Sequence, residues 1–172
     1  MIKKKLFLDN KLVDECLDKI SFINKNGVIK GKSSYSSHQI INENDIIKTI
    51  VNEFIDMAGP EYHLIDIWSQ KYDKGGYVEE HNHIPVIDIL KNVDCKAGVY
   101  FYKKPKMSGD FILEGKKQNI EEGDMILFDS DKNHYSLPNE TNEERIIFSI
   151  NLAKGVKKIW KNNQWEFIKV YG

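Results

Sequence analysis

After residue 60 the sequence consists largely of short segments typical of β-strands, each separated from the next by turn residues. We expect strands at residues 62–72, 77–83, 98–103, 110–113, 125–128 and 145–152. Two earlier segments repeat apolar residues at helical spacing. Their apolar positions are Leu12, Val13, Cys16, Leu17, Ile20 and Ile23, and then Ile46, Ile47, Ile50, Val51, Phe54 and Ile55. Many short strands after two helices favour a mainly β fold, an antiparallel sandwich or jelly roll with helices on one outer face.

Capping residues set the expected helix ends. Gly27 lies where the first helix would be capped, while Asn44 or Asp45 would begin the second, which stops before Gly59. The polar segment 31–37 between the helices is interpreted as a surface loop. We interpret His38 and His63 as structural residues.

We expect a single domain in residues 1–172, since this length is enough to bury a core. Within it, residues 1–60 would form a helical support region, 61–152 the jelly-roll core and 153–172 a C-terminal β-hairpin. The hairpin would place Trp160 and Trp165 as partners across its two strands.

Composition limits the binding partners and the cellular compartment that we expect for this chain. The net charge of −1 gives no support to nucleic-acid binding or to a membrane-surface role. No apolar run is long enough for a membrane span, and the apolar run near the start is too short for a secretory leader. Only Cys16 and Cys95 are present, without framework spacing, so a reduced, cytoplasmic setting is expected.

A His-x-His pair is the main chemical signal. His81 and His83 are two residues apart on an expected strand, so their side chains share a face and can share a metal ion. His134 follows the apolar segment 123–128, and Arg145 opens the next strand. This order suggests a mononuclear metal site with a bound carboxylate cosubstrate, although each residue alone also fits a plain surface role. Arg145 in particular could simply pair with Glu143 or Glu144.

Strand parity groups further polar residues with this site. Arg145, Ile147, Ser149 and Asn151 alternate onto one face of their strand. Asp66, Trp68, Gln70 and Tyr72 alternate onto one face of another. Either set could line a pocket or face solvent.

The segment Gln70-x-Tyr72-x-x-Gly75-x5-His81-x-His83 resembles the Asn-x-Tyr-x-x-Gly-x5-His-x-Asp segment of AlkB-type dioxygenases. Segments 98–102, 108–111 and 123–128, with His134 and Arg145, are similar to the wider iron(II)/2-oxoglutarate oxygenases, including prolyl-hydroxylase-like and small phage or bacterial members. The resemblance covers roughly residues 62–152. It implies a double-stranded β-helix, a jelly roll of cupin-like form, with Fe(II) and 2-oxoglutarate as cofactors.

The same resemblance implies residue roles. His81 and His134 match the iron-binding histidines, and Arg145 matches the cation that holds the far carboxylate of 2-oxoglutarate. Gln70 and Tyr72 match positions that hydrogen-bond the cosubstrate, and Tyr100 or Tyr102 could add a hydroxyl. Ser149 and Asn151 are further candidates because they share the face of Arg145.

The chain departs from the family pattern at three positions. His83 stands where the family has a carboxylate ligand, so either His83 is a third nitrogen ligand or Glu79, Glu80 or Asp88 substitutes, or His83 is no ligand. We favour His83, with Glu79 next because it shares the parity of His81. Gln70 replaces an Asn, and Ile147 removes an expected hydroxyl.

These features predict an iron(II)- and 2-oxoglutarate-dependent dioxygenase, a hydroxylase acting on an unknown small molecule or protein side chain. The alternatives are a cupin-type dioxygenase with three metal-binding histidines and a jelly-roll module that binds a small molecule without catalysis. The spacing from Gly123 to His134 is long for a cupin motif. The sequence leaves substrate and oligomeric state open.

Overall fold

The computed structural model describes residues 1–24, 31–37, 40 and 44–170. It contains the helices α1 (Asn10–Leu17) and α2 (Asp45–Ala58) and the 3-10 turn η2 (Asp88–Leu90). The early strands are β1 (Ile2–Lys5), β2 (Ile23–Asn24), β3 (Gly31–Lys32), β4 (Ser34–Tyr35), β5 (Tyr62–Tyr72), β6 (Tyr77–His81) and β7 (Cys95–Lys103). The later strands are β8 (Phe111–Leu113), β9 (Lys116–Lys117), β10 (Asp124–Asp129), β11 (His134–Ser136), β12 (Arg145–Lys154), β13 (Val156–Lys161) and β14 (Gln164–Lys169). No described helix is long and apolar enough to cross a membrane.

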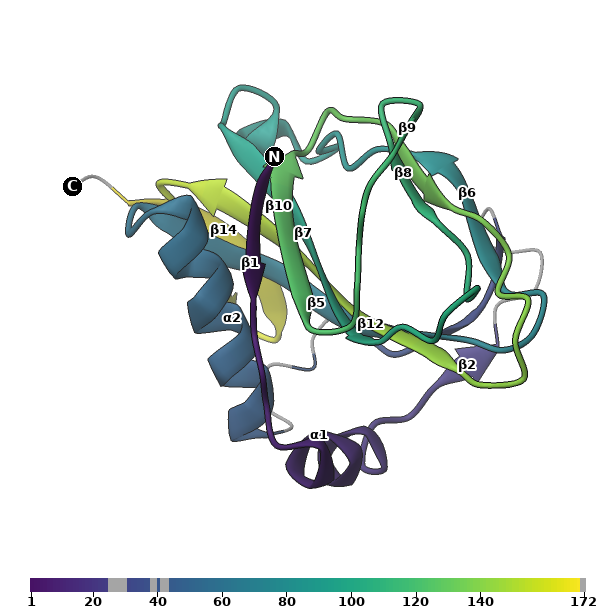
Figure 1. Cartoon of the computed structure of the whole chain (residues 1–172). Helices are drawn as coiled ribbons and strands as arrows, with labels where there is room; N and C mark the ends of the chain where they lie inside the picture. Colours follow the sequence, from purple (N-terminus) through teal and green to yellow (C-terminus); the bar gives the residue numbers. More distant parts are fainter. Residues whose placement is uncertain (25–30, 38–39, 41–43, 171–172) are drawn as a thin grey trace.

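Two antiparallel sheets face each other, as Figure 1 shows. The larger has the strand order β1-β10-β7-β12-β5-β4-β2, and the smaller has the order β3-β6-β11-β8-β9. Successive strands from β5 to β12 alternate between the sheets, apart from β9, which follows β8 in the smaller one. This winding is a double-stranded β-helix, so the predicted jelly roll is confirmed.

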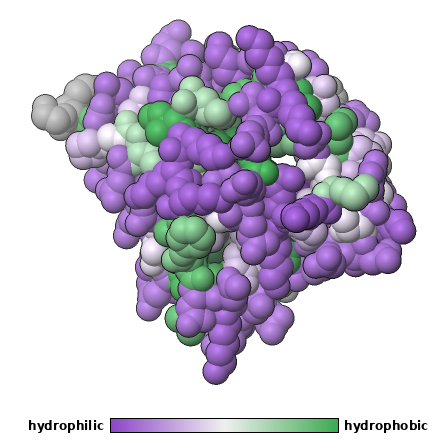
Figure 2. Space-filling view, in the orientation of Figure 1, coloured by the Kyte–Doolittle hydropathy of each residue, from purple (hydrophilic) through white to green (hydrophobic). Residues whose placement is uncertain are grey.

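Apolar side chains fill both sides of the larger sheet. On the outer side, Phe54 of α2 packs over Gly98 of β7, where an added Cβ would lie 2.5 Å from the Phe54 ring. On the inner side, Phe101, Phe111 and Phe128 pack between the two sheets. Figure 2 shows mainly hydrophilic residues on one face of the molecule, with hydrophobic residues in separate patches. The packing of Phe54 on Gly98 shows that the helices cover the outer face of the larger sheet. Its inner face lines the space between the two sheets.

One of the two predicted helices is confirmed, and the other is shorter than predicted. α2 is confirmed, with Asn44 as its N-cap and Gly59 at its end. α1 is shorter than predicted because it ends at Leu17, and Ile23 lies in β2 instead. The expected cap at Gly27 and the residue His38 lie outside the described residues.

The interpretation of residues 31–37 as a surface loop was wrong. β3 pairs with β6 in the smaller sheet and β4 pairs with β5 in the larger one, so this segment crosses between the sheets. Ser33, Tyr35 and Ser36 are buried. Two-residue strands carry too few residues to show a period, which is why the sequence read as a loop.

The first five residues were not expected to form a strand. β1 pairs along β10, and Lys3 and Lys5 bind the buried carboxylate of Asp124 at 2.7 and 3.1 Å. The N-terminal region thus contributes strands as well as helices. At the other end the predicted hairpin is confirmed, with Trp160 opposite Trp165 and ring centroids 5.1 Å apart.

Candidate functional site

A β-bulge in β6 turns His81 into the space between the sheets. His81 pairs with His134, but Ser136 pairs with Val78, so β6 has one residue more than β11 in this interval. Val78 and His81 therefore both line the interior although they are three positions apart. Glu79 is exposed, and the expectation that it shares the face of His81 was wrong because the bulge breaks the alternation.

His83 follows β6 and is held by its backbone. Its amide N–H donates to the carbonyl of Ser130 over 2.8 Å. The imidazole ring lies 5.7 Å from the ring of Trp68 and 4.9 Å from that of His134. His83 is thereby placed against both sheets rather than in solvent.

The three histidines converge. One nitrogen from each of His81, His83 and His134 lies within 4.8 Å of the others, which is close enough for one metal ion to bind all three. His134 is buried, while His81 and His83 are half-buried. The described residues Glu79, Glu80 and Asp88, named from the sequence as substitute ligands, do not belong to this group and are exposed.

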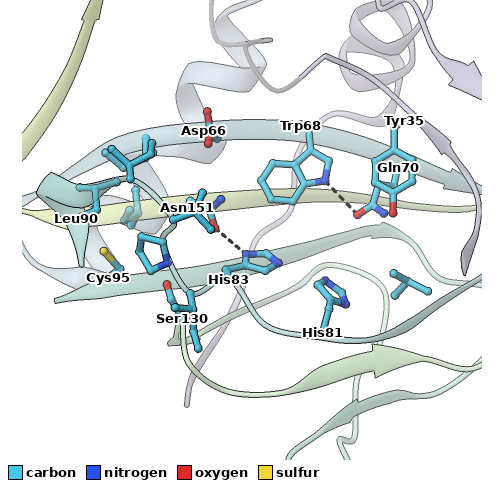
Figure 3. Close-up of a pocket in the computed structure, with 17 residues that line it drawn as sticks. Tyr35, Asp66, Trp68, Gln70, His81, His83, Leu90, Cys95, Ser130 and Asn151 are labelled. Atoms are coloured by element: carbon cyan, nitrogen blue, oxygen red, sulfur yellow. Dashed lines mark hydrogen bonds between the residues drawn. The ribbon is translucent and has the colours of Figure 1, made fainter. Parts of the chain in front are cut away.

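Each histidine uses the same ring nitrogen in a hydrogen bond to an oxygen. Nδ1 of His81 lies 2.8 Å from the carbonyl of Glu79, and Nδ1 of His134 lies 3.1 Å from that of Lys132. Nδ1 of His83 lies 2.7 Å from Oδ1 of Asn151 (Figure 3). Because a carbonyl oxygen only accepts, Nδ1 carries the proton in a neutral ring and Nε2 carries the lone pair. This tautomer suits a metal site, in which the nitrogen away from the metal donates to an oxygen.

The electrostatics favour a neutral ring at His134. Burial, together with the nearby rings of His81 and His83, lowers the pKa of His134 from 6.5 to about 3. A neutral imidazole is the form that binds a metal ion. The cluster is therefore ready to bind a metal ion at neutral pH without losing a proton from His134.

Arg145, at the start of β12, is the chain's only arginine and is 2% exposed. Its Nη1 donates to the carbonyls of Ser108, Gly109 and Leu137, and its Nη2 donates to the hydroxyl of Ser136 over 2.9 Å. The guanidinium lies 4.1 Å from the ring centre of Tyr72. Gly109 makes room, since its φ is 89° and a Cβ there would lie 2.7 Å from Nη1.

No carboxylate among the described residues lies within ion-pair distance of Arg145, so the expected alternative of a pair with Glu143 or Glu144 is not observed. Burial lowers the pKa of Arg145, the opposite of what a nearby carboxylate would do. An arginine nonetheless stays protonated. The interior thus holds a positive charge whose hydrogen-bond acceptors are neutral.

The hydroxyl that Ile147 removes from β12 is supplied by another strand. Ser136 lies on β11, two residues after His134 on the same strand face, and its Oγ contacts Arg145. Sequence reasoning missed Ser136, although the alternation from His134 was a signal that could have found it. Tyr72 also contacts Ser136 and lines the same space.

The remaining residues on the two polar faces have partners within the protein. Gln70 accepts hydrogen bonds at Oε1 from Trp68 (3.2 Å) and Ser149 (3.3 Å). Asn151 contacts His83, so it supports a histidine instead of reaching the space beside Arg145. Gln70, Tyr72 and Ser149 line that space.

Tyr100 and Tyr102 do not reach the site. They lie on the opposite face of β7, where their hydroxyls donate to the carbonyls of Leu6 and Asn10. Their cosubstrate role was therefore predicted wrongly, because parity alone did not say which face of β7 is inner. Val99 and Phe101 occupy the inner face instead.

Two cavities meet at the histidines. The inner cavity, between the sheets, has a volume of only about 30 Å³ and is bordered by His134, Arg145 and Tyr72. The outer cavity has a volume of about 410 Å³ and lies between β5, β12 and the segment after His83 (Figure 3). Trp68, Gln70, Val78, His81 and His83 border both. A metal ion at the histidines would stand at their junction.

Comparison with known proteins supports the fold described above. No protein-family model and no curated protein matches the sequence. The structure is similar to a viral collagen prolyl hydroxylase of Paramecium bursaria Chlorella virus-1, solved with 2-oxoglutarate, at a TM-score of 0.66 and 18% identity over 89% of this chain and 95% of that one.

Two further solved structures show the same fold. The carbocyclase SnoK from nogalamycin biosynthesis, described as non-heme and α-ketoglutarate-dependent, has a TM-score of 0.69 and 10% identity over 85% of this chain and 74% of that one. A predicted oxalate decarboxylase of Thermotoga maritima has a TM-score of 0.51 and 16% identity over 79% of this chain and 95% of that one.

Proposed function

We propose that this protein is an iron(II)- and 2-oxoglutarate-dependent oxygenase and that it acts as a hydroxylase. The observation that carries the proposal is Arg145, a buried cation without a carboxylate partner among the described residues, in the interior that also holds the three histidines. An unpaired buried charge costs several kcal/mol in order of magnitude. A dicarboxylic ligand whose far carboxylate meets Arg145 would remove that cost.

The donor groups fit the two cofactors. His81, His83 and His134 would bind the metal through Nε2, since Nδ1 of each is engaged with an oxygen. Imidazole nitrogens suit iron, and also zinc, copper and nickel. Arg145 would hold the far carboxylate, aided by the hydroxyl of Ser136, and Tyr72 would keep the guanidinium in place.

With both cofactors bound, such a site would couple decarboxylation of 2-oxoglutarate to substrate hydroxylation, one oxygen atom of dioxygen entering succinate and the other entering the hydroxylated substrate. The protein's own residues bind and orient the cofactors and exclude water. The apolar side chains of Val99, Phe101 and Ile147 form the dry wall of the inner cavity.

The inner cavity must open to admit the cosubstrate. Its volume of about 30 Å³ suits water-sized molecules, whereas 2-oxoglutarate has ten non-hydrogen atoms. Trp68 and Gln70 are among the residues that border both cavities, so movement of these side chains would join the two spaces. Cosubstrate binding should therefore change the environment of Trp68.

A cupin-type metal enzyme is the second candidate. The three-histidine set and the likeness to the predicted oxalate decarboxylase favour it. A cupin of that type has no need of a buried arginine beside the metal. The role of Arg145 therefore separates the two proposals.

The test is an anaerobic iron(II) titration with and without 2-oxoglutarate, followed by the weak visible charge-transfer band of the iron–keto acid chelate. We expect the band only when both are present, and its loss in His134→Ala. In Arg145→Ala it should require much more 2-oxoglutarate. Iron binding without a 2-oxoglutarate response would assign the cupin function, and no iron binding would leave a jelly-roll binding module.

A further inference from the structure

The outer cavity is large enough to hold a substrate. Its volume of about 410 Å³ is within the range of roughly 300–1,000 Å³ typical of pockets for small organic molecules. His81 and His83 border its inner end, and Leu90 and Cys95 lie toward the other end in Figure 3. A molecule bound there would have one end beside the histidines.

The walls of this cavity are mainly apolar. Ile65 and Leu152 come from β5 and β12, and Leu90 comes from η2. Two polar residues of the lining contact other protein groups: Asp66, the one charged residue among those that line the cavity, pairs with Lys158 at 2.6 Å, and Asn151 is bound to His83. Asp66 is thus neutralised inside the protein, and the cavity presents no net charge of its own to a ligand.

In the segment between His83 and η2, several apolar side chains are exposed to solvent. Val86 is 87% exposed, Ile84 58% and Ile87 38%, and all three border the cavity. Single exposed apolar residues are ordinary, but a contiguous set at the mouth of a cavity indicates a binding site. An apolar molecule in the cavity would bury part of these side chains.

We propose that the outer cavity binds an uncharged, apolar small molecule, a hydrocarbon chain or ring system, and holds one of its C–H groups beside His81 and His83. This substrate class rests on the proposed oxygenase function. The binding step itself needs neither metal nor 2-oxoglutarate, because the apolar walls are formed by the protein alone.

The test uses metal-free protein in which Trp68 is the only tryptophan, made by Trp160→Phe and Trp165→Phe. Trp68 borders the cavity, while the other two lie in the hairpin. The probes are decanol and its charged counterparts decanoate and decylammonium. We expect saturable changes in Trp68 emission with decanol, and binding at least about tenfold weaker for both charged probes, since the walls offer no unpaired charge.

A matched pair of variants locates the binding. Ile84→Glu places a carboxylate at the cavity mouth, and Ile23→Glu places one at a similarly exposed isoleucine that does not border it, the exposures being 58% and 61%. Decanol affinity should fall about tenfold or more in Ile84→Glu, and remain unchanged in Ile23→Glu. His134→Ala should still bind decanol, so a failure of the metal site is distinguished from a failure of this inference.

Cobalt(II)-loaded protein provides the second readout. Protons of bound decanol should show paramagnetic relaxation that His134→Ala abolishes, as expected if the chain lies beside the histidines. Absence of any saturable decanol response would overturn the inference. So would equal affinity for the three probes, or self-association in sedimentation that Ile84→Glu prevents, which would assign the apolar segment to a protein partner.

Discussion

His83 and Asn151 form a hydrogen bond of 2.7 Å between Nδ1 and Oδ1, across a separation of 68 residues. The bond joins the segment after β6 in the smaller sheet to β12 in the larger one. The other two histidines of the cluster donate to carbonyls two residues earlier in the chain. The orientation of His83 therefore depends on a side chain from the opposite sheet.

Asn151→Ala should lower metal affinity about tenfold to a hundredfold, the usual range for loss of a partner behind a metal-binding histidine. Asn151→Asp keeps an oxygen acceptor and should restore most of the affinity. Asn52→Ala, on the exposed face of α2, serves as the control for an Asn-to-Ala change. Competition titration with a chromophoric chelator measures all three. Unchanged metal affinity in Asn151→Ala would show that Asn151 does not position His83 for metal binding.

Arg145→Ala should weaken 2-oxoglutarate binding about thirtyfold or more, since loss of one partner of a buried charge pair costs about 2–5 kcal/mol. Arg145→Lys keeps the charge but loses the planar fork and the stacking on Tyr72, so its affinity should be intermediate. The measurement is the 2-oxoglutarate concentration that gives half of the chelate band. Iron affinity without 2-oxoglutarate should be similar in all three proteins, and a parallel loss would point to misfolding instead.

The pKa of His134 predicts an acid-sensitive fold. The pKa of His134 is about 3 in the folded protein against 6.5 ordinarily, so between these pH values the unfolded chain binds more protons. The free energy of unfolding should fall as the pH falls through this window, by at most about 1.4 kcal/mol per pH unit from this residue, and its contribution should be constant above the window. Urea unfolding of metal-free protein with and without His134→Gln isolates the effect. Equal pH slopes in the two proteins would contradict it.

Motif order and the family resemblance were enough to predict most of the candidate site, and strand alternation added the pairing of His81 with His83. His81, His83 and His134 were chosen from the sequence and lie together, and Arg145 lies in the same interior. The residue Ser136 and the exposed position of Glu79 were missed because both depend on the register between β6 and β11, which includes a bulge. Register is set by pairing between distant segments, and no single strand shows it.

The same limit explains the errors in the fold. The predicted jelly roll followed from the number of short strands after two helices and from the family resemblance, and the alternation of the long strands β5 and β12 showed which residues share a face. β3 and β4 have two residues each, so only their partners β6 and β5 define them. For Tyr100 and Tyr102 the alternation was correct, but the inner face of β7 is decided by where the helices pack, which the sequence of β7 does not contain.

Tyr102→Phe should destabilise the fold without affecting cosubstrate binding. Its hydroxyl lies 3.1 Å from the carbonyl of Asn10 and 3.0 Å from the carboxylate of Asp14, both in α1. Loss of these bonds should lower the free energy of unfolding by about 1–3 kcal/mol. Urea unfolding measures this, and the 2-oxoglutarate titration should match wild type. Weaker 2-oxoglutarate binding with an unchanged free energy of unfolding would show that Tyr102 takes part in cosubstrate binding.

Exchange of His83 tests whether a third nitrogen ligand is used at all. His83→Ala should reduce iron affinity at least about tenfold, since it removes one of three ligands while Nε2 of His81 and His134 remain in place. His83→Asp would create two histidines and one carboxylate, the set typical of non-heme iron oxygenases, and should recover iron affinity. Asn151 can turn its amide to donate to that carboxylate, because an Asn side chain carries both a donor and an acceptor. Zinc and iron titrations of the three proteins provide the comparison, with His63→Ala as a control outside the cluster. If His83→Ala binds iron as tightly as wild type, His83 is not a ligand, and the outer cavity then begins at a two-histidine site.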